Sequence, residues 1–377
     1  MKIDRVRADG YKNLTDVDIS PSDGINVLLG DNAQGKTNFI EAVWLMTGCR
    51  SFRGTRDRDH IGFDRDKAEI EVDLTDKVRS QTIRFCAKKG IKEREIELNG
   101  VKLPLLSRTF GTLKCVVFTP EDLSIAKGSP DNRRTFIDLS ASQLKISFVH
   151  ALNRYNDILS QRNALIKDIQ QGLAPRDQLD IWDLQLARTG AYISVVRDTY
   201  CTNLNNYTDS LYHQITNGNE KLKLYYQSTI YRDTDMILCG RTDTDGELAD
   251  IYLDKLRRSA DDDIRAGYTT CGIHRDDLTM RINDLSVREF GSQGQQRSAA
   301  LAMKIAQARI IKQQTGDAPV MLLDDVMSEL DEKRQELILS NTDGIQIFIT
   351  CCDGRIGLLG SDRSLRTFTV EKGRISG

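Results

Sequence analysis

The 377-residue sequence lacks the features that mark membrane, secreted and disulfide-rich proteins. No apolar run approaches the roughly 18 residues that a membrane-spanning helix needs. The first residues, MKIDRVRADG, lack the apolar core of a signal peptide. Eight cysteines are present, but no C-x-x-C pair and no matching histidine spacing accompanies them. We therefore expect reduced, buried thiols in a cytoplasmic protein that has no membrane partner.

The sequence also has few prolines, and its basic residues do not outnumber its acidic ones. Six prolines, with 39% hydrophobic and 29% charged residues, describe an ordinary folded protein rather than a disordered one. The formal net charge of −2 excludes a uniformly basic nucleic-acid binder. Local basic faces stay possible, because RSFRGTRDR (50–58), KKGIKER (88–94) and NRR (132–134) concentrate Arg and Lys. Each run taken alone also fits solvated surface charge.

The first part of the chain predicts α/β structure. GINVLLG (24–30) is a short apolar strand bounded by glycine, and the residues after it suit a helix. Polar and apolar residues alternate between 67 and 98, which is typical of antiparallel strands closed by the Asn99-Gly100 turn. VVF (116–118) predicts a further strand.

From Pro130 the pattern becomes helical, with Ser129 as a candidate N-cap. Two apolar stripes predict a long helical hairpin, interrupted at QQGLAPRDQ (170–178) by Gly and Pro. KLKLYYQSTI (221–230) predicts a strand and ELADIYLDKLRR (247–258) a helix. The stripes, which we expect to pack against each other, contain Phe148, Leu152, Tyr155 and Leu159, and Ile193, Val196, Tyr200, Leu204, Tyr207 and Leu211.

Strand patterns return after Gly267, in LTMRI (278–282), APVMLL (318–323) and IQIFIT (345–350). The chain is long enough for two or three domains. We predict an α/β lobe in two halves, residues 1–122 and 267–377, with a mainly helical segment, residues 123–266, inserted between them.

GDNAQGKT (30–37) matches the phosphate-loop pattern G-x-x-x-x-G-K-S/T in full. Its glycines let backbone amides turn inward around phosphates, and the following helix N-terminus adds its dipole. Lys36 would reach the β- and γ-phosphates of ATP, and the Thr37 hydroxyl would hold Mg²⁺. The predicted nucleotide-binding residues are Gly30, Asp31, Asn32, Ala33, Gln34, Gly35, Lys36 and Thr37.

APVMLLDDVMSELD (318–331) places two carboxylates at the end of an apolar strand. The carboxyl ends of strands in open α/β sheets are where ligands bind. Asp324 would hold the Mg²⁺ through water, and Asp325 would orient or deprotonate the attacking water. The alternative is a pair of helix-capping aspartates.

FGSQGQQRSAALAMK (290–304) places Ser, Gly and Gln at the start of an Ala-rich helix. Ser292 and Gln295 fit a capping box, so one interpretation is a helix start whose backbone N–H groups are satisfied by its own side chains. That interpretation leaves Gly294 and Gln296 unexplained, since Gly inside a first turn costs up to about 1 kcal/mol. A helix N-terminus with a serine hydroxyl suits phosphate. We hypothesise that one subunit closes on the γ-phosphate held by Lys36 of another subunit, using Ser292, Gln293, Gly294 and Gln295.

The combination of phosphate loop, S-x-G-Q stretch, Asp-Asp strand and SELD (328–331) resembles the ATPase heads of the ABC and SMC superfamily. The similarity to the bacterial RecF recombination-mediator family is closer and covers nearly the whole chain. It implies an α/β, ABC/SMC-like ATPase head, a P-loop NTPase with a mixed sheet and an inserted, mainly helical lid or arm domain. The similarity is carried by GDNAQGKTNFIEA, RSFR, FTPEDLSIAKGSPDNRRTFIDL (118–139), RYNDILSQRN (154–163), IWDLQLARTGAYISVVR (181–197), GIHRDDL (272–278), FGSQGQQRS and LLDDVMSELD.

The resemblance implies binding of ATP with Mg²⁺ and a head-to-tail, ATP-dependent homodimer around two nucleotides. It also implies binding of gapped or junction DNA and, with RecO- and RecR-like partners, loading of RecA near the nucleoid. Ser328 and Asp331 would form the D-loop. Because Asp325 stands where transporter ATPases place Glu, and Thr350 where they carry a switch His, we predict slow hydrolysis. Two departures from the family pattern are Ala33 in place of Gly and Ile273 in place of Pro.

DNA affinity in such a system comes from Arg and Lys against phosphates, so it should fall steeply with salt and show little base preference. The alternative for Arg133 and for Arg134 is pairing with Asp138 along their helix. Arg275, next to Asp276 and Asp277, belongs either to a local ion-pair set or to a ligand contact. The candidate DNA contacts are Arg50, Arg53, Arg56 and Arg133.

Three other functions fit these residues less well. A transporter ATPase subunit would need a membrane partner and normally Glu after Asp324. An SMC-like structural DNA tether would need coiled arms far longer than the segment between the two halves. A metabolic P-loop kinase would have no role for FGSQGQQRS.

Overall fold

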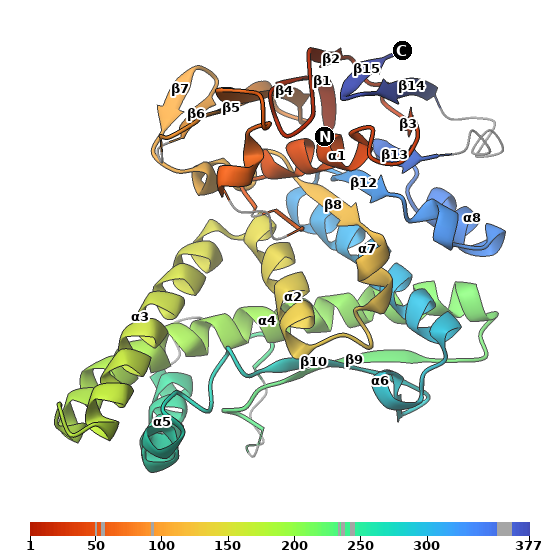
Figure 1. The fold of residues 1–377 in the computed structure, drawn as a ribbon. Helices are drawn as coiled ribbons and strands as arrows, with labels where there is room; N and C mark the ends of the chain where they lie inside the picture. Colours follow the sequence, from red (N-terminus) through yellow and green to blue (C-terminus); the bar gives the residue numbers. More distant parts are fainter. Residues whose placement is uncertain are drawn as a thin grey trace. The chain divides into compact units, whose positions relative to one another are not determined.

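The structure is a computed structural model, and its helices and strands are labelled in Figure 1. No helix in the described part of the chain is long and apolar enough to cross a membrane. The structure describes residues 1–49, 51–53, 57–91, 94–232, 234, 238–241, 246–352 and 364–377.

The chain divides into two compact units. The first unit comprises Met1–Ser124, Leu211–Asn219 and Arg297–Gly377, and the second comprises Ile125–Ser210 and Glu220–Gln296.

A six-stranded, mostly parallel sheet carries the predicted apolar strands of the first unit, in the order β15-β14-β3-β13-β12-β8. Every residue of β12 and β13 is buried, as expected for a parallel sheet covered on both faces. Only β15 runs antiparallel, as the second strand of a hairpin with β14. The strands are β3 (Ile25–Leu29), β8 (Cys115–Phe118), β12 (Val320–Asp324), β13 (Ile347–Cys351), β14 (Leu365–Glu371) and β15 (Arg374–Ser376).

A second six-stranded sheet of the first unit is antiparallel, in the order β2-β1-β4-β5-β6-β7. Alternating side chains bury one face of β4 and β5, as predicted from the sequence. Asn99 and Gly100 have φ of 52° and 78°, so they form the predicted hairpin turn with both central residues left-handed. The strands are β1 (Lys2–Asp9), β2 (Val17–Ile19), β4 (Lys67–Thr75), β5 (Ser80–Lys88), β6 (Glu95–Leu98) and β7 (Val101–Leu103).

Helix α7 (Gln293–Thr315) begins in the second unit and continues through the first. Its Ala-rich part is buried, and Lys304 in that part donates from Nζ to the Val117 carbonyl oxygen of β8 at 2.8 Å. The same ammonium pairs with Asp122 at 2.8 Å. The other helices of the first unit are α1 (Lys36–Leu45), α8 (Glu332–Ser340), and the 3-10 helices η1 (Asp57–His60), η2 (Leu106–Thr109), η3 (Pro120–Ser124) and η5 (Met327–Glu329).

The second unit contains most of the predicted helical hairpin, formed by α3 (Ile146–Gln170) and α4 (Leu179–Thr216), whose residues from Leu211 onward belong to the first unit. The α3 stripe (Phe148, Leu152, Tyr155 and Leu159) and the first part of the α4 stripe (Ile193 and Val196) join one buried cluster, so these parts pack in one core as predicted. The rest of the α4 stripe, from Tyr200 to Leu211, is not part of that cluster. The cluster also takes in helix α5 (Gly246–Ala266), whose Tyr252 ring lies against Gly190. A Cβ on Gly190 would lie 2.5 Å from that ring, so α4 needs glycine there. Helix α2 (Pro130–Leu144) begins at Pro130, as predicted, and η4 (Arg176–Gln178) lies between α3 and α4.

A three-stranded antiparallel sheet completes the second unit, in the order β11-β10-β9. The strands are β9 (Leu222–Gln227), β10 (Asp277–Ile282) and β11 (Leu285–Ser286), and the short helix α6 (Val287–Phe290) follows. Strand β10 pairs with β9 along its whole length. The sequence pattern placed β9 in the inserted segment, residues 123–266, and β10 in the second half of the α/β lobe, residues 267–377, so this pairing crosses the predicted boundary.

The eight cysteines are all free. Six are buried, as predicted, whereas Cys239 is half-buried and Cys352 is exposed.

Candidate nucleotide-binding site

The phosphate loop joins strand β3 to helix α1 in the first unit. A Cβ on Gly30 would lie 2.3 Å from a backbone oxygen of β14, and Gly35 has φ 121°. The Lys36 ammonium is buried and donates to the carbonyl oxygens of Gly30 and of Asp31, the latter at 2.9 Å. It also lies 3.3 Å from the Cys352 sulfur. The predicted strand–loop–helix context is therefore present.

The turn between β14 and β15 holds the middle of the phosphate loop. The Lys372 backbone N–H donates to Gln34 Oε1 at 2.6 Å, and the Gly373 N–H donates to the Gln34 carbonyl oxygen at 2.8 Å. The Asn13 amide donates to the Ala33 carbonyl oxygen at 3.4 Å. Ala33 itself has φ 64°, in the left-handed region. Segments from both ends of the chain therefore fix this loop.

Asp324 ends strand β12 beside the phosphate loop. The Thr37 hydroxyl donates to Asp324 Oδ1 at 3.0 Å, and the Thr350 hydroxyl donates to the same oxygen at 2.9 Å. Burial raises the pKa of the Asp324 carboxyl, and the two hydroxyl donors oppose that rise. A carboxylate and a hydroxyl oxygen are the protein ligands that Mg²⁺ takes in phosphate sites, so the donor set fits this ion.

Asp325 follows Asp324 with φ 54°, a left-handed conformation that Asp and Asn tolerate better than most residues. Its backbone N–H donates to the Thr350 hydroxyl oxygen at 2.8 Å. Its carbonyl oxygen accepts a hydrogen bond from the Ser328 hydroxyl at 2.8 Å. The Asp325 backbone is thus fixed on both sides, while its half-buried carboxylate stays at the edge of the sheet.

The two predicted D-loop residues have different surroundings. Ser328 contacts Asp325, so it lies at the site. Asp331 is the N-cap of α8, where its carboxylate accepts from the Arg334 N–H at 3.0 Å and pairs with the Arg334 guanidinium. The Asp331 side chain is therefore engaged by its own helix.

The predicted signature residues form the first turn of α7, in the second unit. The capping box is complete, because Gln295 N–H donates to Ser292 Oγ at 3.2 Å and Ser292 N–H donates to Gln295 Oε1 at 2.8 Å. The Gln295 amide also donates to Glu220 at 2.7 Å, and the Gln296 amide donates to the Gly291 carbonyl oxygen at 2.8 Å. Gln296, which the capping-box interpretation left unexplained, therefore stabilises the start of the helix.

The candidate DNA contacts differ in exposure. Arg53 is exposed, and its guanidinium donates to Asn38 Oδ1 at 3.3 Å, on the phosphate-loop helix. Arg133 is 2% exposed and its guanidinium binds both carboxylate oxygens of Asp277 at 2.7 and 2.8 Å. This burial argues against a DNA contact by Arg133. Arg50 and Arg56 lie outside the described residues.

The other local pairs also differ from the alternatives drawn from the sequence. Asp138 pairs with Arg197 at 2.8 Å, not with a neighbour on its own helix. Arg275 lies 4.8 Å from the centre of the Tyr268 ring. The carboxylate of Asp276 is buried and accepts from the Thr229 hydroxyl at 2.9 Å. These residues therefore organise the second unit internally.

The sequence did not predict the contacts of two residues at the nucleotide site. Thr350 entered it only as a replacement for a histidine, yet it contacts both Asp324 and Asp325. Cys352, two positions further on, donates to Asn32 Oδ1 at 3.0 Å. Both lie at the carboxyl end of β13, the edge at which ligands bind, and that position was the available signal.

Comparison with known proteins identifies the family. Residues 2–376 match the model of the RecF/RecN/SMC N terminal domain. The chain is 36% identical over 380 residues to the DNA replication and repair protein RecF of Clostridium acetobutylicum, which covers 100% of this chain and 99% of that protein. The chain belongs to the RecF family. A solved structure of the recombination mediator protein RecF-ATPrS in the RecFOR pathway matches this RecF-family chain with a TM-score of 0.90, at 32% identity, over 100% of this chain and 97% of that one.

The Smc head domain from Pyrococcus furiosus, bound to the C-terminal domain of ScpA, matches with a TM-score of 0.54 at 14% identity. That match covers 99% of this chain and 95% of the Smc chain, and it shows the fold alone. The predicted ABC/SMC-like ATPase head is therefore confirmed. Because the chain belongs to the RecF family, neither a transporter ATPase subunit nor a metabolic kinase is supported. Its similarity to SMC proteins extends to the fold alone.

Proposed function

We propose that this RecF-family chain is an ATP-dependent recombination mediator of DNA repair and replication-fork maintenance. It binds gapped or junction DNA in the bacterial cytoplasm, close to the nucleoid, and helps to load RecA with RecO- and RecR-like partners. The observation that carries the proposal is the meeting of Lys36, Thr37 and Asp324 at one edge of the parallel sheet. The likeness to a RecF structure that contains an ATP analogue supports it.

In this proposal the phosphate loop binds ATP. Backbone amides of residues 30–37 surround the phosphates, and the Lys36 ammonium exchanges its carbonyl partners for phosphate oxygens. Thr37 and Asp324 would hold Mg²⁺, which supplies positive charge to the phosphates when bound. The pKa of Asp324 is raised by burial, so metal binding is favoured at neutral rather than acidic pH.

Asp325 would orient the attacking water, and the reaction would be slow. The Asp325 side chain is one methylene shorter than the Glu of transporter ATPases. Thr350, which stands in place of their histidine, has its hydroxyl engaged by Asp324 and by the Asp325 N–H. Hydrolysis therefore acts as a switch that releases the ATP-bound form rather than as a source of rapid turnover.

The complete site would form between two copies of the chain. Residues 292–295 of one copy close on the γ-phosphate held by Lys36 of the other, in an ATP-dependent homodimer. Support comes from the start of α7, where Ser292 is exposed at a helix N-terminus, a position that suits an anion. DNA contacts come from arginines near the phosphate loop, with Arg53, Arg50 and Arg56 as candidates.

The test measures size and nucleotide turnover together, with and without ATP and with and without gapped duplex DNA. Lys36→Ala should abolish ATP binding, while the exposed control Lys77→Ala should bind ATP as the parent does. Asp325→Asn should accumulate an ATP-bound dimer, because Asn keeps the φ of 54° and removes the charge. Retained ATP affinity in Lys36→Ala, or parental turnover in Asp325→Asn, would remove these residues from the proposed roles.

A further inference from the structure

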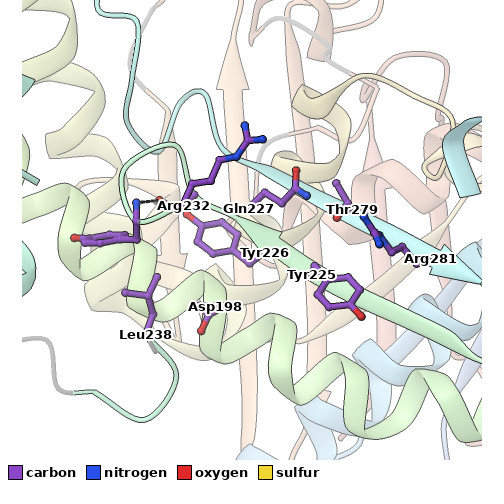
Figure 2. A pocket seen from close by; sticks show the side chains of 10 residues that line it. Asp198, Tyr225, Tyr226, Gln227, Arg232, Leu238, Thr279 and Arg281 are labelled. Atoms are coloured by element: carbon purple, nitrogen blue, oxygen red, sulfur yellow. Dashed lines mark hydrogen bonds between the residues drawn. The ribbon is translucent and has the colours of Figure 1, made fainter. Parts of the chain in front are cut away.

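An open pocket of about 610 Å³ lies on the second unit, beside the ends of β9 and β10 (Figure 2). Strand β9 contributes Tyr225 and Gln227, strand β10 contributes Thr279 and Arg281, and Arg232 follows β9 in the chain. The pocket lies wholly within this unit and contains none of the residues predicted for nucleotide binding. Its volume suits one nucleotide-sized group.

An aromatic ring is presented to solvent at this pocket. Tyr225 is 41% exposed and pairs across the sheet with Thr279, so its ring lies on the outer face of β9. The Arg281 guanidinium lies 5.9 Å from the centre of that ring. Exposed aromatic rings with an arginine beside them are the platforms on which nucleic-acid bases stack.

The described lining of the pocket contains two arginines. Arg232 and Arg281 are exposed, and neither forms an ion pair within the described part of the chain. Lys223 is not a lining residue, but it is exposed, lies opposite Arg281 in the neighbouring strand and forms no ion pair within the described residues. The buried arginines of the same unit are all held by carboxylates, in the pairs Arg133–Asp277, Arg162–Asp183 and Arg197–Asp138.

Polar groups that suit a base edge complete the pocket. The Thr279 hydroxyl oxygen is buried and has no hydrogen-bond partner in the described structure. The Gln227 side chain is exposed beside it and offers both a donor and an acceptor (Figure 2). Asp198, from α4, also lines the pocket, and burial raises the pKa of its carboxyl. The described lining therefore holds two arginines, Arg232 and Arg281, against one carboxylate.

We infer that this pocket holds a base and its phosphate from single-stranded DNA. The base stacks on Tyr225, and the flanking phosphates contact Arg281, Arg232 and Lys223. An acidic peptide would use the cations but would leave the exposed ring and the unpaired Thr279 hydroxyl without a partner. This inference rests on the proposed DNA-binding function and adds to it a surface for the single strand of a gap, separate from the nucleotide site.

The experiment measures binding of a fluorescein-labelled oligothymidine by the ATP-bound protein at several salt concentrations. Tyr225→Ala should lower the affinity roughly tenfold, because one stacked base is lost. Arg281→Ala should lower the slope of log affinity against log salt by about 0.7, the value for one lost phosphate contact on a single strand. Tyr268→Ala is the matched control, since Tyr268 is 45% exposed and carries Arg275 at 4.8 Å but lies outside the pocket.

Photo-cross-linking of the unaltered protein to an oligonucleotide that contains 5-iododeoxyuridine gives a second measurement that needs no variant. The adduct should map to the peptide that contains Tyr225. Parental affinity and salt slope in both variants, or an adduct only elsewhere, would overturn the inference. If the parent binds gapped duplex but not the oligothymidine, the inference fails and the proposed function stands. If the parent binds neither, both fail.

Discussion

Ala33 holds a backbone conformation that alanine disfavours. Its φ of 64° lies in the left-handed region, which costs a residue with a Cβ about 1–2 kcal/mol. The resemblance to RecF-like chains places Gly at this position. The carbonyl oxygen of Ala33 accepts from Asn13, so the conformation is imposed by neighbours rather than chosen by the residue. The phosphate loop of this chain therefore carries local strain.

We expect Ala33→Gly to raise the free energy of unfolding by about 0.5–1 kcal/mol, since the relieved strain exceeds the entropy that glycine loses on folding. Denaturant unfolding measures the change. The same substitution at Ala266, in the last turn of α5, should instead lower stability by about 0.5–1 kcal/mol. Equal destabilisation at both positions would show that Ala33 is unstrained.

His274 belongs to a hydrogen-bond chain whose direction is determined at both ends. Its Nε2 lies 3.1 Å from the Thr269 carbonyl oxygen, so Nε2 carries the proton and donates. Nδ1 is then the acceptor for the Tyr155 hydroxyl at 3.0 Å. The Tyr155 oxygen accepts from Tyr252 at 3.0 Å, and the Tyr252 oxygen accepts from the Ile273 N–H at 3.1 Å. The chain is satisfied only when the His274 ring is neutral.

Burial lowers the pKa of His274 to about 4, below its ordinary value of 6.5. The unfolded state therefore binds more protons between these values, and stability falls as the pH drops from 6.5 to 4. The expected loss is up to about 3 kcal/mol across that window. His274→Gln should flatten this part of the stability–pH curve, whereas His150→Gln, at an exposed position, should leave it unchanged. An identical pH slope in His274→Gln and parent would contradict the buried neutral ring.

At the scale of elements, the β14–β15 hairpin supports the phosphate loop although the two are more than 300 residues apart in the chain. Its turn glycine, Gly373, has φ 81°, and a Cβ there would lie 1.7 Å from the Asn13 carbonyl oxygen. The turn therefore fits between Asn13 and Gln34 only with glycine. The hairpin therefore contributes to the nucleotide site by holding Gln34 of the phosphate loop in place.

Gly373→Ala should push this turn away and break both hydrogen bonds to Gln34. Each is worth about 1 kcal/mol, so we expect ATP affinity to fall by up to roughly thirtyfold if the whole loss appears in binding. The control is Gly344→Ala, where φ is 68° but nothing lies within 4 Å of the added Cβ. Equilibrium binding of a fluorescent ATP analogue measures both variants. If the two bind alike, the hairpin does not position the loop.

Local patterns predicted the elements well, because each depends on residues close in sequence. The phosphate loop, the Asn99-Gly100 turn and the capping box of Ser292 are all of this kind. Two features depended on distant partners instead. Arg133 is held by Asp277, 144 residues away, and Thr350 reaches Asp324 because β12 and β13 are neighbours in register. A short stretch of sequence does not show whether an arginine is buried or which strand lies next to a given strand in the sheet.

At the scale of the whole molecule, the predicted nucleotide residues divide between the two units. The phosphate loop, Asp324, Asp325 and Ser328 belong to the first unit, and Ser292 belongs to the second. Ser292 is exposed at the start of α7, and a helix N-terminus with a serine hydroxyl suits a phosphate. This division is the physical basis of the proposed dimer.

Ser292→Arg tests that proposal directly. The bulky cation should block the approach of a second copy, so ATP should bind to the monomer with parental affinity but no longer drive dimerisation. The variant also loses the serine cap, at about 1 kcal/mol, and Ser292→Ala loses the same cap without the bulk. Gel filtration with ATP and Mg²⁺ should therefore show a monomer for Ser292→Arg and a largely dimeric Ser292→Ala. A Ser292→Arg protein that dimerises as the parent does would mean that the start of α7 does not face the partner's nucleotide.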